Sequence, residues 1–246
     1  MIVNIYFVVL LLFMAYQSIS GYFYFKKNKE IELEEKIKVN MYYSTIIVNL
    51  ISCIIPIVIF VISKVKLSSI GFNKIKFNYD TSLNKYIVYL SYAFILIIII
   101  LSIKTIVGFF VKNTNNESIN QSKLGPSEKM LQPITKKEKN LWKLVSLNTG
   151  ITEEIVYRGT LIYIIGNLVG SSSLFNVVII TNIIFGLGHS YQGIKGVVKT
   201  GLIGFLFSIL YVTTNSLILP MILHFFIDYV FIFTSNKEEL LQNAER

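Results

Sequence analysis

The ionisable side chains that could do chemistry gather in the last hundred residues of the chain, inside apolar segments. They are two glutamates, an arginine, two histidines and an aspartate, namely Glu153, Glu154, Arg158, His189, His224 and Asp228. An ionisable group at membrane depth costs about 2.5 to over 10 kcal/mol, so such groups usually pair with one another or serve a function. Carboxylates and imidazoles are common proton carriers in catalysis, which points to an active site inside a membrane bundle.

The first motif places two adjacent glutamates ahead of an arginine. Glu154 and Arg158 are four residues apart, so on a helix they share a face and can pair. Adjacent helical residues point roughly 100° apart, so we expect Glu153 to project elsewhere, free of Arg158. One carboxylate would then be held ionised while the other is available for proton transfer. The alternative interpretation is a salt bridge at a helix end beside an acidic residue that the helix dipole favours.

Two further motifs hold the only histidines of the chain. Phe185 and His189 are four residues apart, as are His224 and Asp228, so each pair shares a helix face. A carboxylate beside a histidine is typical of metal sites, where it orients the ring. Each motif alone could equally be a buried pair that only ties helices together. Together the three motifs are stronger evidence for an active site. They include every histidine of the chain, and they lie at compatible depths in the membrane, so all three can face one cavity.

The composition indicates the class of protein in which these motifs lie. The chain has 246 residues, of which 53% are hydrophobic and 15% charged, whereas soluble domains carry about 25% charged residues. Its net charge of +9 comes mainly from lysines in polar loops between apolar segments. We therefore expect these loops to contact anionic lipid, and we do not expect nucleic acid as a partner. Cys53 is the only cysteine, which excludes an internal disulfide and a cysteine-based metal site.

The elements that must position the motifs are transmembrane helices. We predict an all-α polytopic membrane protein, a bundle of about seven transmembrane helices with the active site in the C-terminal four. Its parts are N-terminal transmembrane segments at 1–111, a polar cytoplasmic linker at 112–140, the core at 141–234 and a polar tail at 235–246. The core helices are expected at about 141–169, 172–189, 194–212 and 216–234. The first segment has no basic n-region and no A-x-A-like site, so we expect a retained helix.

Lysine placement predicts the orientation in the cell membrane. The linker at 112–140 holds six lysines, and Lys195 and Lys199 follow His189, whereas the links at 170–173 and 213–216 hold none. The positive-inside rule places the linker and the link after His189 in the cytoplasm, and the active site facing that side. The loop at 63–85 does not fit, because its five lysines would lie outside.

The order and spacing of the motifs resemble a known family. An EExxxR motif, an FxxxH motif and an HxxxN/D motif on successive membrane helices are similar to the CPBP family, the CAAX proteases and bacteriocin-processing membrane proteases also called Abi proteins. The matching residues are Glu153, Glu154 and Arg158, then Phe185 and His189, then His224 and Asp228. The resemblance covers about residues 141–234 and leaves out the N-terminal segments. It implies an intramembrane endopeptidase that cuts a CAAX-type protein, a bacteriocin precursor or a peptide pheromone precursor.

The resemblance also implies a role for each residue. Glu153 would activate the attacking water with help from His189, Glu154 would pair with Arg158, and Phe185 would support the site. His224 and Asp228 would stabilise the oxyanion. Asp228 stands where eukaryotic relatives have Asn, and because an ionised Asp is a poor oxyanion donor, it would be protonated or orient its neighbour.

Two mechanisms use the same residues. Glu153, His189 and His224 could hold Zn²⁺ and leave a position for water, as in a metalloprotease. A glutamic protease would need no metal. The HExxH pattern of zinc proteases and the GxSxG pattern of serine hydrolases are both absent from the sequence.

Two other functions compete with the enzyme. A non-catalytic membrane immunity protein or regulatory partner could use the same bundle for binding. It would gain little from buried charges, so the complete motif set favours a hydrolase. A transporter would need charges along a path through both halves, and the first three segments have almost none at mid-depth.

Overall fold

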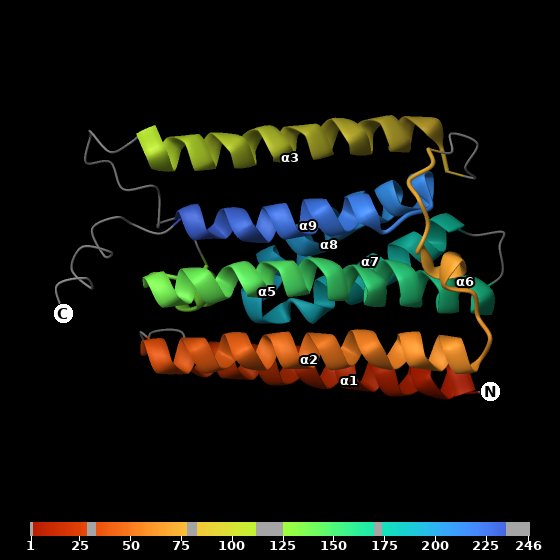
Figure 1. Ribbon diagram of the computed structural model, residues 1–246, viewed down its shortest axis with the longest axis horizontal. Helices are drawn as coiled ribbons and strands as arrows, with labels where there is room; N and C mark the ends of the chain where they lie inside the picture. The colour runs from red at the N-terminus through yellow and green to blue at the C-terminus, as the bar shows by residue number, and fades with distance from the viewer. Residues whose placement is uncertain (1, 29–32, 78–82, 112–124, 170–173, 235–246) are drawn as a thin grey trace.

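The chain folds into a bundle of long, roughly aligned helices in a computed structural model (Figure 1). The structure describes residues 2–28, 33–77, 83–111, 125–169 and 174–234, and within these ranges it contains helices and no strand. The first helices are α1 (Ile2–Lys27), α2 (Glu35–Ile62), η1 (Leu67–Ile70), α3 (Lys85–Val111) and α4 (Pro126–Leu131). The later ones are α5 (Lys136–Glu154), η4 (Ile155–Leu161), α6 (Ile162–Val169), α7 (Leu174–Gly188), η6 (Ser190–Gln192), α8 (Gly193–Thr214), α9 (Ile218–Val230) and η7 (Phe231–Thr234).

Four of the described helices are long and apolar enough to cross a membrane: α1, α2, α3 up to Gly108, and η6 with α8. Helices α7 and α9 are apolar but shorter. Many large apolar side chains on the outside of the bundle are uncovered, for example Leu12 at 66%, Ile62 at 65% and Leu90 at 60% exposure. An apolar surface of this extent is suited to lipid and not to water. The prediction of an all-α polytopic membrane protein is confirmed.

The helix boundaries differ from the predicted ones mainly at polar ends. Helix α2 begins at Glu35, six residues before Met41, where the second apolar segment is predicted to begin. Helix α5 begins at Lys136, five residues before the predicted start at 141. The linker predicted at 112–140 therefore contains α4 and the first turn of α5, while residues 112–124 and the tail at 235–246 lie outside the described ranges. Thr135 explains the early start of α5, because its hydroxyl accepts from Glu138 N–H at 3.1 Å as an N-cap.

Helix α5 lies at the centre of the bundle and contacts both α2 and α9. In Figure 1, α1 and α2 run along one edge and α3 along the opposite edge. Gly150 lets α5 approach α9 closely, since a Cβ there would lie 2.7 Å from the backbone nitrogen of Phe225. Gly186 does the same between α7 and α8, where a Cβ would lie 2.7 Å from the carbonyl oxygen of Val197. Small residues at these crossings bring together the helices that carry the three motifs.

The N-terminal hairpin of α1 and α2 is tied to the C-terminal helices by polar contacts. Lys38 on α2 is 4% exposed, and its Nζ donates to the carbonyl of Gln132 at 3.2 Å and lies 3.7 Å from Oε1 of Glu138. On α1, the Ser18 hydroxyl lies 2.9 Å from the Ser190 hydroxyl. The hairpin is therefore part of the same packed body as the motif helices.

Candidate active site

The glutamates and the arginine of the first motif lie where α5 passes into η4. Oε1 of Glu154 accepts from Nη1 of Arg158 at 2.7 Å. Nη2 of Arg158 donates to the carbonyl of Gly204 on α8 at 3.0 Å, and the guanidinium lies 4.4 Å from the ring centre of Phe185. Both charged groups are buried, with Glu154 at 0% and Arg158 at 1% exposure. The predicted pair is confirmed, and it is held by α8 and by the aromatic ring of the second motif.

Segment η4 is a stretch of π-helix, which the sequence spacing does not predict. It runs from Ile155 to Leu161 and contains Arg158. A π-turn inserts an extra residue per turn and is often found at functional sites. Here it follows directly after Glu153 and Glu154, so the pair with Arg158 forms across the junction between the two helix types.

His224 on α9 faces all three carboxylates of the site. Its Nδ1 donates to Oε1 of Glu154 at 2.7 Å. Its Nε2 lies 3.9 Å from Oε2 of Glu153 and 3.7 Å from Oδ2 of Asp228. Glu154 therefore links two cations or potential cations, Arg158 and His224. Groups this close exchange protons as one coupled set.

His189 lies at the end of α7 and is held by its own helix. Its Nδ1 donates to the carbonyl of Phe185 at 2.9 Å, and the two rings are 4.8 Å apart. This hydrogen bond leaves Nε2 as the nitrogen that can accept a proton or bind water. The predicted shared face of Phe185 and His189 is confirmed.

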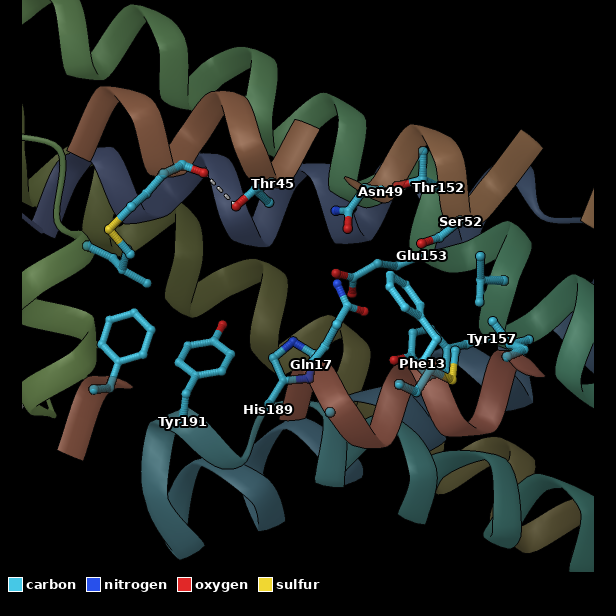
Figure 2. Close-up of a pocket in the computed structure, with 17 residues that line it drawn as sticks. Phe13, Gln17, Thr45, Asn49, Ser52, Thr152, Glu153, Tyr157, His189 and Tyr191 are labelled. Atoms are coloured by element: carbon cyan, nitrogen blue, oxygen red, sulfur yellow. Dashed lines mark hydrogen bonds between the residues drawn. The ribbon is translucent and has the colours of Figure 1, made fainter. Parts of the chain in front are cut away.

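A cavity of about 260 Å³ opens in front of Glu153 and His189. Figure 2 shows both side chains directed into it, with Gln17 from α1 and Asn49 from α2 near Glu153. Tyr157 from η4 and Tyr191 from η6 also line it. His224 and Asp228 lie behind Glu153 and do not line this cavity.

Glu153 is the carboxylate available for chemistry in this arrangement. Its Oε2 makes no hydrogen bond within the described residues and has almost no exposed surface. A buried carboxylate oxygen that lacks a donor can accept a proton from a bound water. Arg158, by contrast, is bound to Glu154 and Gly204 and does not pair with Glu153, as the spacing predicts.

A metal ion needs several protein ligands that converge on one point. Within the described ranges, no three or more of the His, Cys, Asp and Glu side chains are arranged to hold a metal ion. Nδ1 of each histidine is bonded to an oxygen acceptor, Phe185 or Glu154, which leaves Nε2 of each ring free, as in histidines that bind a metal. In the described residues it is therefore the spacing of the donors, and not the chemistry of the two rings, that differs from a metal centre.

The structure brings together all seven residues of the three motifs: Glu153, Glu154, Arg158, Phe185, His189, His224 and Asp228. It also adds residues that sequence reasoning missed, above all Gln17 and Asn49 from the N-terminal hairpin. A signal for them exists in the sequence, because Gln17 and Asn49 are amides inside otherwise apolar segments. Amides do not titrate, so the criterion of ionisable groups at membrane depth does not select them.

Comparison with protein families supports the inference drawn from the motifs. Residues 139–230 match the family model described as type II CAAX prenyl endopeptidase, Rce1-like. No curated protein and no solved structure matches the chain. The matched stretch contains every residue of the three motifs, which confirms the resemblance to CAAX proteases. Residues 139–230 are therefore similar to the domain of the Rce1-like type II CAAX prenyl endopeptidases.

Proposed function

We propose that the chain is an intramembrane endopeptidase that hydrolyses a peptide bond of a membrane-associated peptide or protein by water activated at Glu153. The substrate would be a CAAX-type protein or a bacteriocin or pheromone precursor. The proposal rests on the placement of Glu153. One oxygen of its carboxylate has no hydrogen-bond donor within the described residues, and the side chain lines a cavity together with His189. Nε2 of His224 lies 3.9 Å from that oxygen.

The reaction follows from this placement. Water bound between Glu153 and His189 would give a proton to the carboxylate while its oxygen attacks the carbonyl carbon of the scissile bond. The proton held by Glu153 would then pass to the leaving nitrogen as the C–N bond breaks. The products are a carboxylic acid and an amine, and Glu153 returns to its starting state.

His224 would supply positive charge behind the reacting centre. With Nδ1 bonded to Glu154, its Nε2 is directed toward Glu153 and Asp228. A protonated imidazole there would stabilise negative charge on the tetrahedral intermediate. Asp228 lies 3.7 Å from Nε2. Its carboxylate would orient the ring and favour the protonated form of the imidazole. Of the two roles expected for Asp228, this is the orienting one. Arg158 and Phe185 would position Glu154.

The same proposal includes a cellular setting. We infer a multi-pass protein of the cell membrane whose site faces the cytoplasmic side, with the lysine-rich loops on anionic lipid and no nucleic-acid partner. Exposed Lys195 lies in the first turn of α8, three residues after the end of η6, at the end of the bundle where His189 lies, which supports this orientation.

Comparison of membrane peptidomes tests the activity. Cells that express the wild type, Glu153→Gln and the control Glu35→Gln would be compared. The Glu35 side chain is 41% exposed and lies 3.6 Å from that of exposed Lys137. We expect peptide products with the wild type and with Glu35→Gln, and none with Glu153→Gln at equal protein level. Identical peptidomes together with an unchanged cellular phenotype would favour a non-catalytic immunity or regulatory role.

A further inference from the structure

The wall of the cavity opposite the motif helices comes from α1 and α2, which lie outside the matched domain at 139–230. Helix α2 contributes Met41, Thr45, Asn49 and Ser52 to the lining. Their spacing of three and four residues places them on one helix face. Helix α1 contributes Leu10, Phe13, Met14, Gln17 and Phe25. The site is therefore a groove between two walls, and the N-terminal hairpin forms one of them.

The groove is longer than the reacting group requires. From Met41 to Ser52, α2 rises roughly 16 Å at 1.5 Å per residue, and an extended peptide of about five residues covers that length. In Figure 2, Thr45 and Tyr191 lie to one side of Glu153, and Ser52 and Tyr157 lie to the other. A bound peptide would thus pass Glu153 and continue toward Thr45 and Tyr191.

The chemistry of the hairpin wall is polar but uncharged. Apart from Glu153 and His189, the lining residues that the structure describes carry no charge. Asn49 reaches Thr149 only at the limit of a hydrogen bond, 3.5 Å, and no hydrogen bond of the Gln17 amide group occurs within the described ranges. Each primary amide offers two donors and one acceptor, which matches the alternating N–H and C=O groups of an extended peptide.

An amide side chain on α1 or α2 is unfavourable if it has no hydrogen-bond partner. Both helices are mainly apolar and mostly exposed on their outer faces, so a polar amide there is costly unless it has a partner. Asn49 and Gln17 instead face the same cavity as the catalytic carboxylate. A substrate backbone would provide the missing partners.

We infer that the α1–α2 wall is a substrate-binding subsite that takes an extended peptide segment of about five residues with uncharged side chains, and that Asn49 and Gln17 bind its backbone. This inference rests on the proposed protease activity and assigns specificity to helices outside the family domain. Asn49 and Gln17 are specificity-determining residues here and take no part in the proton transfers.

Internally quenched peptides test the length and charge of the subsite. The purified full chain in detergent would receive an uncharged peptide that it cleaves and matched peptides with Lys at each position in turn. We expect Lys to lower kcat/KM about tenfold or more over roughly five consecutive positions, and to have little effect beyond them. Equal tolerance of Lys at every position would overturn the inference.

Asn49→Leu tests the contact itself, with Asn40→Leu as the matched control on the same helix. Asn40 is exposed and does not line the cavity. We expect Asn49→Leu to raise KM about tenfold with kcat within twofold, the size expected for one or two lost hydrogen bonds, and Asn40→Leu to match the wild type. Unchanged KM in Asn49→Leu would refute the subsite while leaving the proposed function intact.

Binding measured without turnover separates the two hypotheses. Fluorescence anisotropy of a labelled uncharged peptide on Glu153→Gln gives Kd directly, and the double variant Glu153→Gln/Asn49→Leu should bind about tenfold more weakly. Equal Kd values would refute the subsite. If the wild type cleaves no peptide, or if Glu153→Gln cleaves as fast as the wild type, the proposed function fails and the inference fails with it.

Discussion

Nδ1 of His224 lies 2.7 Å from Oε1 of Glu154, the same oxygen that Nη1 of Arg158 contacts at 2.7 Å. One carboxylate oxygen thus fixes a guanidinium and an imidazole that come from different helices. The bond at Nδ1 sets the rotation of the ring, so that Nε2 is directed toward Glu153 and Asp228. Glu154 therefore determines the position of His224 as well as that of Arg158.

Replacement of Arg158 should destabilise the fold strongly. Arg158→Met would leave the buried Glu154 carboxylate with His224 as its remaining partner, and loss of one member of a buried ion pair costs about 3–5 kcal/mol. We expect a marked fall in the unfolding temperature in detergent, and recovery of much of it in the double variant Glu154→Gln/Arg158→Met. Wild-type stability in the single variant would show that the pair is not important for the fold.

The two histidines should differ in their effect on stability. Both His189→Gln and His224→Gln are expected to lower kcat by about 10²-fold or more, because His189 would hold the attacking water and His224 would stabilise the tetrahedral intermediate. His224→Gln should also lower the unfolding free energy by about 1–3 kcal/mol, since Glu154 loses a buried charged partner. Among the described residues, the His189 side chain has one hydrogen-bond partner, a carbonyl of its own helix, so its variant should unfold like the wild type. Cleavage assays and thermal unfolding measure the two effects separately.

The crossing of α5 and α9 should not tolerate a side chain at Gly150. A Cβ there meets the backbone of Phe225 at 2.7 Å and the carbonyl of Met221 at 3.1 Å, and backbone cannot move aside as a flexible side chain can. We expect Gly150→Ala to cost about 1–3 kcal/mol and to displace His224 from Glu154, with loss of activity. Gly166→Ala is the control, because nothing lies within 4 Å of a Cβ at that position. That variant should be as stable as the wild type or slightly more stable.

Chelators distinguish the two mechanisms that the motifs allow. If Glu153 activates water without a metal, prolonged dialysis against EDTA or phenanthroline should leave kcat/KM within about twofold, a change below 0.5 kcal/mol. Elemental analysis of the active, purified protein should then find less than one metal ion per chain. Loss of activity on chelation, restored by Zn²⁺, would instead support a metalloprotease that uses Glu153, His189 and His224.

The sequence was sufficient to predict the helical membrane fold and the residues of the three motifs, because apolar length and four-residue spacing are local properties. The pairing of Glu154 with Arg158 follows from spacing alone. The contact between His224 and Glu154 does not, because those residues are 70 positions apart and meet only where α9 crosses α5 at Gly150. The π-helical segment at Ile155–Leu161 likewise depends on packing against neighbouring helices.

The position of the N-terminal hairpin in the bundle is also not predictable from local sequence patterns. The apolar segments predict both of its helices, but no motif indicates that Asn49 and Gln17 line the cavity of Glu153. Apolar helices such as α1 and α2 have no strong sequence preference for one partner, because lipid and protein are almost equally apolar. Their placement depends on a few polar contacts, such as those of Lys38 with Gln132 and Glu138.

The contact between Ser18 and Ser190 joins residues that are 172 positions apart. A ribosome therefore completes the first wall of the groove long before it starts the second. Until α5 and α7 follow, the α1–α2 hairpin lacks the helices that it contacts in the finished bundle. Assembly of the cavity is consequently among the last events of biogenesis, and a chain that stops before α7 has neither His189 nor an enclosed site.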